Sequence, residues 1–196
     1  VFCTFNQTSG RGQGEHKWES EGGKNISFSF LVRPKFILPS EQFLLTQIAS
    51  LSVVDMLKKY IKEEVYVKWP NDIYVKNNKI CGMLVQNKVI GNEFVGVYFG
   101  IGINVNQRKF FFAPNPTSMS IETNQEYDLD TILNEFLSCF KRRYTQIQQG
   151  KKEEVKQEYL SLLLYKDIQK HYKYKDKEIE ATIKDVDEYG YLLLKT

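Results

Sequence analysis

VYVKWPNDIYVKNNKICGMLV, at residues 65–85, predicts three short β-strands in succession, because β-branched and aromatic side chains dominate it. The strands are expected at residues 65–69, 73–75 and 79–85. Pro70 ends the first strand because proline cannot donate to a sheet, and the Asn-Asn pair after the second strand suits a hairpin turn, since Asn tolerates a positive φ angle. We therefore expect a hairpin that presents Asn71 and Asp72 at one end of a sheet.

Further strands and helices are predicted on both sides of this hairpin. Apolar residues alternate over residues 26–31, as in a half-buried strand, and a long strand punctuated by glycines is expected at residues 94–105. Ser40 is expected to cap a helix whose apolar residues recur every three or four positions and form one buried face. Asp128 or Asp130 is expected to cap a second helix that ends at Gly150.

The remaining segments are a third helix, two C-terminal strands and two loops. The helix is predicted at residues 153–163 and the strands at residues 177–186 and 191–195. Residues 8–16 are expected to form a long mobile loop, and residues 107–127 a loop without regular structure that orders with ligand.

Composition bounds what this chain can be. At 196 residues, with 42% hydrophobic and 26% charged residues, it can form one domain, or one domain with a small appendage. A net charge of +3 does not favour nucleic acid as a main partner. We expect no membrane span, because no apolar run reaches about 18–20 residues. Three widely spaced cysteines suit a reducing, cytoplasmic location rather than a disulfide framework.

The Gly-rich stretch TSGRGQGEH, residues 8–16, is the first segment that suggests chemistry. Arg11 lies between Gly10 and Gly12, so backbone N–H groups and a guanidinium can both approach a phosphate or carboxylate. Taken alone, the stretch fits a flexible surface loop better than a binding site.

The pentapeptide KWPND and the lysine seven residues after it form the second segment. Lys79 begins the strand after the hairpin turn, so its amine can lie near Asp72. Such a pair is most often a solvated salt bridge, but at the floor of a cleft the lysine could hold a carboxylate and a phosphate together.

GIGINVN at residues 100–106 is the third segment. Alternating glycines clear one face of a strand, so that something flat can lie against the backbone, and Asn104 then offers a donor and an acceptor. A bulged strand packed against a helix explains the same pattern equally well.

In this order, NQTSGRG with KWES, KWPND, KxxGxL and GIGINVN strongly resemble the catalytic domain of biotin–protein ligase, also called biotin–[acetyl-CoA-carboxylase] ligase. The resemblance implies an α+β fold of the class II synthetase type, with a mixed β-sheet and helices packed on one face. A small SH3-like β-barrel follows in the family. Residues 1–165 would be the catalytic domain, and residues 166–196 the start of the SH3-like domain.

The resemblance also implies an activity. The chain would be an ATP-dependent ligase that activates biotin as biotinyl-5′-AMP and transfers it to a lysine of the biotin carrier domain of a carboxylase. Mg²⁺ would arrive with ATP, so no dedicated metal site is expected. The family's helix-turn-helix is not visible, so no DNA partner is expected, and a homodimer is left open.

Site residues follow by match to the motifs. Lys79 would bridge biotin's carboxylate and the α-phosphate, Asp72 would orient Lys79, and Arg11 would clamp the acyl-phosphate. Gln7 would bind biotin's polar ring and Trp18 would wall the pocket. The full biotin-binding set would be Gln7, Gly10, Arg11, Gly12, Gln13, Trp18, Lys79 and Gly82, and the ATP or adenylate set Arg11, Asn71 and Asn104.

Two departures from the family pattern stand out. The family loop is usually GRGRxGR, whereas this chain has Gln13, Glu15 and His16 where basic residues are common. Its Ser-Thr-Asn biotin motif is absent, and we expect it to precede Val1.

Two other interpretations remain open from the sequence. A lipoate–protein ligase shares the fold and the adenylation chemistry but lacks the WPND element. A non-catalytic module that binds a nucleotide or a carrier protein would have no need for Arg11, Asp72 and Lys79 together.

Overall fold

The computed structural model describes residues 1–12 and 17–196, with Arg11 described by its backbone only. Its main element is a six-stranded sheet with the strand order β1-β4-β8-β7-β6-β5, in which every neighbouring pair is antiparallel. The strands are β1 Phe2–Thr4, β4 Ile26–Val32, β5 Val65–Lys68, β6 Asp72–Val75, β7 Asn78–Ile90 and β8 Glu93–Ile103. Parallel pairing among the described residues occurs in isolated bridges, such as Val67 with Leu163.

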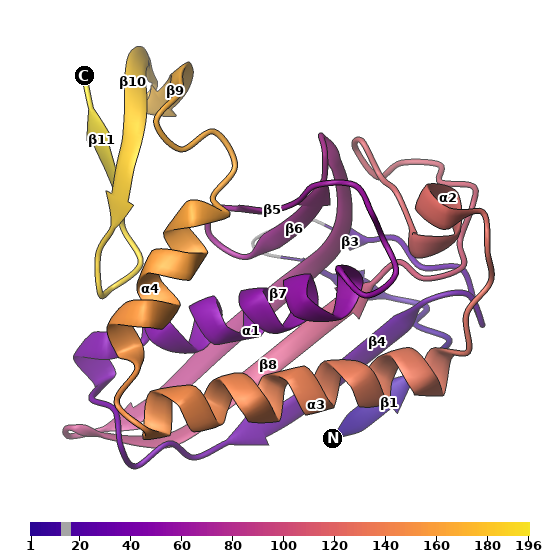
Figure 1. Ribbon diagram of the computed structural model, residues 1–196, viewed down its shortest axis with the longest axis horizontal. Helices are drawn as coiled ribbons and strands as arrows, with labels where there is room; N and C mark the ends of the chain where they lie inside the picture. Colours follow the sequence, from indigo (N-terminus) through magenta and orange to yellow (C-terminus); the bar gives the residue numbers. More distant parts are fainter. Residues whose placement is uncertain (13–16) are drawn as a thin grey trace.

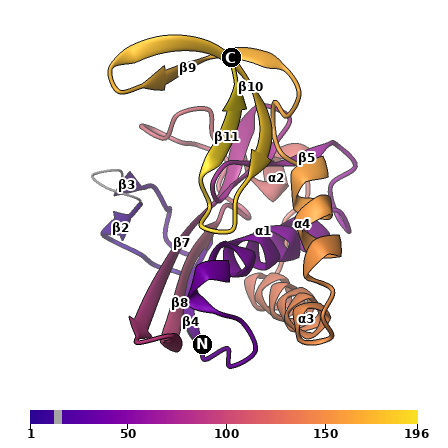
Figure 2. The same cartoon turned by 90° about the vertical axis from the view of Figure 1, so that its left-hand side faces the viewer.

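Helices cover one face of this sheet, which confirms the predicted α+β class (Figures 1 and 2). The sheet itself is antiparallel and not mixed as predicted, because each of its described strands pairs with antiparallel neighbours. The helices are α1 Phe43–Leu57, α2 Met119–Thr123, α3 Leu129–Gln148 and α4 Lys152–Ser161. Aromatic rings fill the space between the sheet and α3: the Phe30 ring centroid lies 4.7 Å from that of Phe99 and 4.8 Å from that of Phe140. Apolar burial of this kind supplies most of the stability of such a layered fold.

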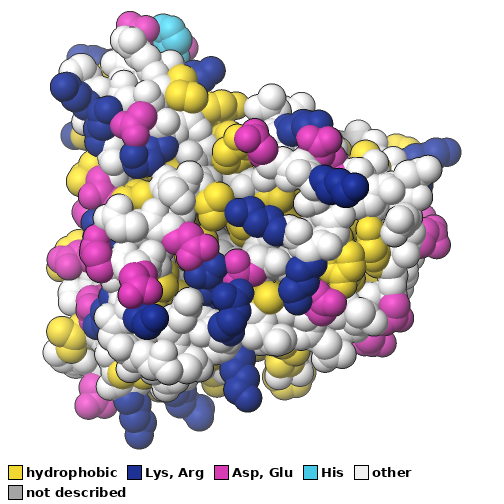
Figure 3. All heavy atoms as spheres, viewed as in Figure 1, with side chains coloured by type: hydrophobic (Ala, Val, Ile, Leu, Met, Phe, Trp, Pro, Cys, Tyr) yellow, Lys and Arg dark blue, Asp and Glu magenta, His cyan; other side chains and the backbone are white. Residues whose placement is uncertain are grey.

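A smaller sheet ends the chain, with the order β11-β10-β9 (Figure 2). Its strands are β9 Gln169–Tyr174, β10 Lys177–Val186 and β11 Leu192–Lys195. On the face seen in Figure 3, acidic and basic side chains are interspersed, in keeping with the small net charge of +3.

The start of α1 differs from the prediction that Ser40 caps it. A 3-10 turn, Pro39–Glu41, comes first, and the Glu41 carboxylate accepts a hydrogen bond from the Leu38 backbone N–H at 3.0 Å. The helix is also buried on nearly every side, because β-sheet, α3 and α4 surround it. The apolar period of the sequence predicted one buried face of α1. It could not show that other elements also cover the remaining faces of this helix.

Three other local predictions have different outcomes. Asp128 caps α3, as one of the two alternatives predicted, and accepts from the Thr131 N–H at 2.8 Å. The positive φ of the hairpin turn falls on Lys76 (53°) rather than on an asparagine. The loop predicted at residues 107–127 contains the short helix α2, which the Ser118 side chain caps.

A buried arginine ties three helices together on the covered face of the sheet. Arg143 of α3, whose side chain is only 4% exposed, bonds Asp55 of α1 and Glu158 of α4 at 2.5–2.7 Å. Each carboxylate faces two guanidinium N–H groups, which is the geometry that makes arginine pairs strong. The cluster fixes α4, from which the chain runs to the small sheet.

Candidate functional site

A cleft of about 700 Å³ lies on the open face of the six-stranded sheet. The strand register places small residues side by side on its floor: Ser27 pairs with Gly102, Gly102 with Gly82, and Ser29 with Gly100. Because these side chains are short or absent, the sheet is hollowed where its strands meet. Segments far apart in the sequence, from β1 to β8, line this cleft.

Trp18 covers part of that glycine floor. It belongs to a two-stranded ladder in which β2, Gly10–Arg11, pairs with β3, Lys17–Trp18. A Cβ atom at Gly102 would lie 2.5 Å from the Trp18 ring, and one at Gly82 would lie 3.1 Å from it. The flat group expected over the glycines is therefore this chain's own indole, whose buried N–H has no hydrogen-bond partner among the described residues.

Lys79 and Asp72 form an ion pair at the cleft, with the Lys79 Nζ 2.6 Å from Asp72 Oδ2. Each side chain is 27% exposed, so the pair lies partly shielded from water. The Lys79 Nζ is also 5.9 Å from the centroid of the Trp18 ring, within the range of a cation–π contact. The predicted proximity of lysine and aspartate is thus what the hairpin produces.

The turn between β5 and β6 is anchored on three sides. The Asn71 Nδ2 donates to the Met83 carbonyl at 2.7 Å, and the buried Tyr159 hydroxyl of α4 donates to the Pro70 carbonyl at 2.9 Å. The Trp69 indole N–H donates to the Gly190 carbonyl, in the turn between β10 and β11, at 2.9 Å. Asn71 lines the cleft, but its amide already serves the turn.

Two other predicted residues lie at different depths. Gln7 lines the cleft, and its Oε1 accepts from the Ser27 hydroxyl at 2.6 Å, which orients its amide. Asn104 is only 3% exposed and is not among the residues that line the cleft. Its Nδ2 donates to the Thr117 carbonyl at 3.0 Å, while its Oδ1 is buried without a partner in the described part of the chain.

The Gly-rich loop is described in part. Gly10 pairs with Trp18, so the ends of the predicted loop form a short ladder, and Gly12 lines the cleft. Arg11 pairs with Lys17 through its backbone, and its guanidinium lies outside the described residues, as does Gln13.

Sequence reasoning missed several residues at the site. Ser27 and Ser29 could have been found from the alternation of their strand, which puts them on one face. Lys68 lines the cleft with its Nζ 3.4 Å from the Tyr74 hydroxyl, and its place at the start of KWPND was a signal. Glu19 accepts three backbone N–H groups from residues 111–113, a contact across more than 90 positions that no local pattern encodes.

Cys81 lies next to the ion pair but is not a reactive thiol. It is fully buried, and burial raises its pKa well above the ordinary value, with the nearby Asp72 adding to the effect. A thiol held protonated in this way is a poor nucleophile at neutral pH.

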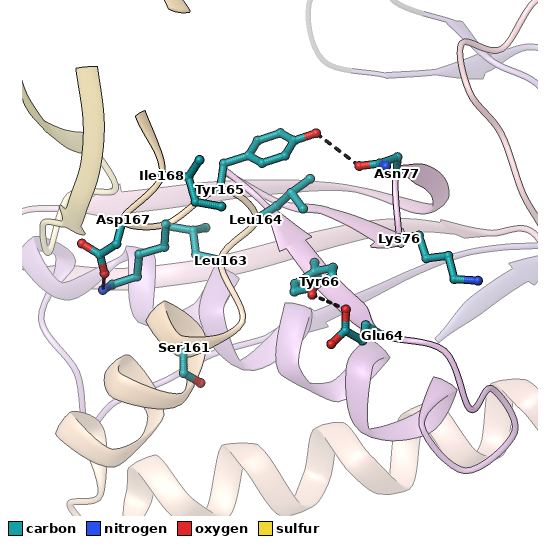
Figure 4. A pocket seen from close by; sticks show the side chains of 11 residues that line it. Glu64, Tyr66, Lys76, Asn77, Ser161, Leu163, Leu164, Tyr165, Asp167 and Ile168 are labelled. Atoms are coloured by element: carbon teal, nitrogen blue, oxygen red, sulfur yellow. Dashed lines mark hydrogen bonds and ion pairs between the residues drawn. The ribbon is translucent and has the colours of Figure 1, made fainter. Parts of the chain in front are cut away.

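A second hollow of about 520 Å³ lies beside the turn of the β6–β7 hairpin (Figure 4). Its polar groups bond to one another: the Tyr66 hydroxyl to Glu64 at 2.6 Å, and the Tyr165 hydroxyl to Asn77 at 3.3 Å. The larger cleft instead combines an ion pair with a floor of small residues, which makes it the better candidate for a reaction site.

Residues 1–12 and 17–196 lack two features that would have suggested other functions. No helix there combines the length and the apolar character that crossing a bilayer requires. No three His, Cys, Asp or Glu side chains gather there as the ligands of a metal ion would.

Comparisons with known proteins place this chain among its relatives. A family model described as "Biotin/lipoate A/B protein ligase family" matches residues 2–104. The chain is 32% identical over 142 residues to the bifunctional ligase/repressor BirA of Bacillus subtilis, covering 70% of this chain and 43% of that protein. It is 30% identical over 122 residues to the biotin–[acetyl-CoA-carboxylase] ligase of Mycobacterium tuberculosis, covering 61% of this chain and 44% of that protein.

A solved structure extends the likeness over the whole fold. The biotin protein ligase from Aquifex aeolicus in complex with biotin and ATP superimposes with a TM-score of 0.82 at 26% identity, covering 99% of this chain and 81% of that one. The chain nevertheless spans less than half the length of the two curated relatives named above. The matched residues 2–104 contain the cleft floor, Trp18, Asp72 and Lys79, and they make up more than half of this chain. The chain belongs to the biotin/lipoate A/B protein ligase family.

Proposed function

We propose that this chain carries the catalytic core of an ATP-dependent biotin–protein ligase. The observation that carries the proposal is the Lys79–Asp72 pair, held at 2.6 Å in a cleft of about 700 Å³ within the segment that matches the family. The likeness to relatives named as biotin ligases supports biotin, rather than lipoate, as the acid.

The first step would join biotin to AMP. A biotin carboxylate oxygen attacks the α-phosphorus of ATP, the bond to the bridging oxygen breaks, and pyrophosphate leaves with the electron pair. Because two anions must approach each other, a fixed cation at the cleft lowers the barrier. Lys79 supplies that charge, and Asp72 keeps its amine pointed into the cleft. Arg11, in the adjoining ladder, is the second proposed cation.

The second step would transfer the biotinyl group. A lysine amine of the acceptor attacks the acyl carbon, the bond from that carbon to the phosphate oxygen breaks, and AMP leaves. The amine loses its proton in forming the amide. The acceptor is proposed to be the biotin carrier domain of a carboxylase.

The cleft floor suits a small bicyclic ring. Ser27 and Ser29 offer hydroxyl groups, Gly100 leaves room beside Ser29, and Trp18, packed on Gly82 and Gly102, supplies an apolar wall. Gln7, oriented by Ser27, is proposed to bind the polar ring of biotin. Gly10, Gly12, Gln13 and Gly82 complete the proposed biotin site, and Asn71 and Asn104 the adenylate site. Mg²⁺ would be carried by the ATP phosphates and would offset part of their charge.

We further propose that residues 1–165 are the catalytic domain and that residues 166–196 begin an SH3-like domain. The separate three-stranded sheet β9–β11, which follows α4, supports this division. A cytoplasmic location and a homodimer belong to the same proposal.

Isotope exchange between pyrophosphate and ATP tests the first step. Exchange should require biotin, and should be at background level with lipoate or with no acid. Exchange that depends on lipoate would reassign the enzyme. If neither biotin nor lipoate supports exchange, the chain would be a nucleotide-binding module without this activity.

A further inference from the structure

Glu19, the residue after Trp18, seats its carboxylate among three successive backbone N–H groups. Phe111 donates to Oε1 at 2.8 Å, and Phe112 and Ala113 donate to Oε2 at 3.0 and 2.9 Å. Consecutive N–H groups that converge in this way form a nest, an arrangement that binds anions. Here the anion is a side chain of the same chain, more than 90 residues away in the sequence.

The Glu19 side chain stays ionised in this nest. Burial on its own would raise the pKa of the carboxyl group, but the three backbone donors outweigh it and hold the pKa below the ordinary value. The carboxylate is therefore ionised at neutral pH, and its hydrogen bonds are charge-assisted.

Apolar packing does not hold the partner loop. The Phe111 side chain is 87% exposed and that of Phe112 is 64% exposed, so neither ring contributes much burial. With little packing to fix residues 111–113, their order depends on the hydrogen bonds that they make, and those of Glu19 engage three successive residues.

The same loop continues into the candidate site. The Lys79 N–H donates to the Asn115 carbonyl at 2.7 Å, and the Thr117 N–H donates to the Lys79 carbonyl at 2.9 Å. The Asn104 amide donates to the Thr117 carbonyl at 3.0 Å. One segment thus holds Lys79 by its main chain, Asn104 by its side chain and, through Glu19, the segment of Trp18.

We infer that Glu19 is a positioning residue, which latches loop 111–117 and thereby sets Trp18 and Lys79 in a fixed relation to each other. This inference rests on the proposed function. Without this latch, which consists of the hydrogen bonds of Glu19 to residues 111–113, a smaller fraction of molecules holds Trp18 and Lys79 in the arrangement that binds ligand. The apparent dissociation constant rises in inverse proportion to that fraction.

Glu19→Gln is the test, with Glu21→Gln as the matched control. A glutamine keeps the shape but has a single acceptor oxygen, and its NH₂ group would face a backbone N–H. Glu21 is exposed, and its bond to Gln107 uses its backbone N–H rather than its carboxylate. Hydrogen exchange of the residue 111–113 amides, measured without ligand, shows how often the latch opens. Biotin-dependent pyrophosphate exchange gives KM and kcat, and thermal unfolding shows whether the variant is as stable as the wild type.

We expect only about a tenth of Glu19→Gln molecules to keep the latch closed. The KM for biotin should then rise about tenfold, and the three amides should exchange at close to the rate of an unprotected chain. The kcat should stay within about twofold, because saturating ligand selects the ready arrangement. Glu21→Gln should match the wild type in all measurements.

Unchanged amide exchange in Glu19→Gln would overturn the inference, and so would faster exchange without a change in KM. A fall in kcat with unchanged KM would also overturn it. A wild type without biotin-dependent activity would overturn the proposed function instead, and amide exchange alone would then decide whether the latch exists.

Discussion

The wall of the cleft formed by β5, β6 and the start of β7 is fixed from three sides, whereas residues 7–12 and 17–19, which form the other described wall, contact the sheet through a few side chains. On the first wall, Pro70 is bonded by a buried tyrosine, Trp69 by the small C-terminal sheet and Asn71 by the main chain of β7. These partners belong to elements that are themselves buried or paired.

Among the residues that the structure describes, the second wall has fewer and more exposed attachments. Gln7 accepts a hydrogen bond from Ser27, and the Trp18 ring packs against Gly102. Glu19 accepts hydrogen bonds from the exposed loop at residues 111–113. This difference in attachment suggests that the two walls have different roles. The wall that carries the Lys79–Asp72 pair must keep charges in place, and such sites are best built on rigid elements. The other wall can yield at low cost when a ligand enters.

Lys79→Ala should give the largest effect, because it removes the charge from the rigid wall. Loss of one positioned electrostatic contact typically costs about 2.7–4 kcal/mol in the barrier, which corresponds to about a hundredfold to thousandfold in kcat. The measurement is biotin-dependent pyrophosphate exchange. Lys76→Ala is the control, because that lysine lies on the same hairpin in an exposed pair with Glu63. Near wild-type exchange in Lys79→Ala would contradict the assigned role.

Gly102→Ala should give the next largest effect, because it disturbs the second wall. The new methyl group would lie 2.5 Å from the Trp18 ring, so the indole must move. Such overpacking costs about 1–3 kcal/mol, and we expect the KM for biotin to rise about tenfold or more. Gly100→Ala is the comparison on the same strand, because its methyl group would also lie on the cleft floor but would make only ordinary contacts from 3.9 Å and none with Trp18. Equal KM values in the two variants would contradict the role of the Trp18 wall.

Tyr159→Phe should show a smaller effect, on stability. It removes the hydroxyl that donates to the Pro70 carbonyl at 2.9 Å while keeping the buried ring. We expect a loss of about 1 kcal/mol in the free energy of unfolding. Tyr66→Phe, which loses an exposed bond to Glu64, should change it by less than about 0.5 kcal/mol. Chemical denaturation of both variants makes the comparison, and equal losses would mean that the rigid wall does not depend on α4.

The rigid wall was largely predictable from the sequence because its parts are close along the chain. Asp72 and Lys79 are seven residues apart on a hairpin, and their strands have clear patterns and turn signals. Strand and helix periods predicted the individual elements, whereas the fold class was implied by the resemblance of the motifs to the family. The cap of α1 was not predictable, since Ser40 competes with a 3-10 turn that Glu41 stabilises.

The second wall and the anchors of the first were not predictable, because they connect distant segments. The hydrogen bond from Trp69 to Gly190 joins residues 121 positions apart in the sequence, and the one from Tyr159 to Pro70 joins residues 89 positions apart. The glycines suggested a flat partner, but only the three-dimensional register shows that this partner is Trp18. Single-sequence patterns report the period of an element and say nothing of which loop lies over it.

Acid should loosen the second wall, and this is the smallest expected effect. The pKa of Glu19 in the fold lies below its ordinary value of 4.5, which the unfolded chain approaches. A carboxyl group with a lowered pKa stabilises the fold above its unfolded pKa, and this contribution is lost as the pH falls through the folded pKa. The latch should therefore be complete at pH 5 and above, and should open at a pH below 4.5.

Limited digestion at the exposed Phe111–Phe112 bond by an acid-active protease measures this opening. Wild-type cleavage, normalised to an unfolded peptide of the same sequence, should accelerate as the pH is lowered from 5 to 3. Glu19→Gln should be cleaved at one high normalised rate throughout, because it has no carboxylate to protonate. Circular dichroism at each pH establishes that the six-stranded sheet is still folded. If wild type and variant accelerate together, acid opens the loop by another route, and protonation of Glu19 is not the cause.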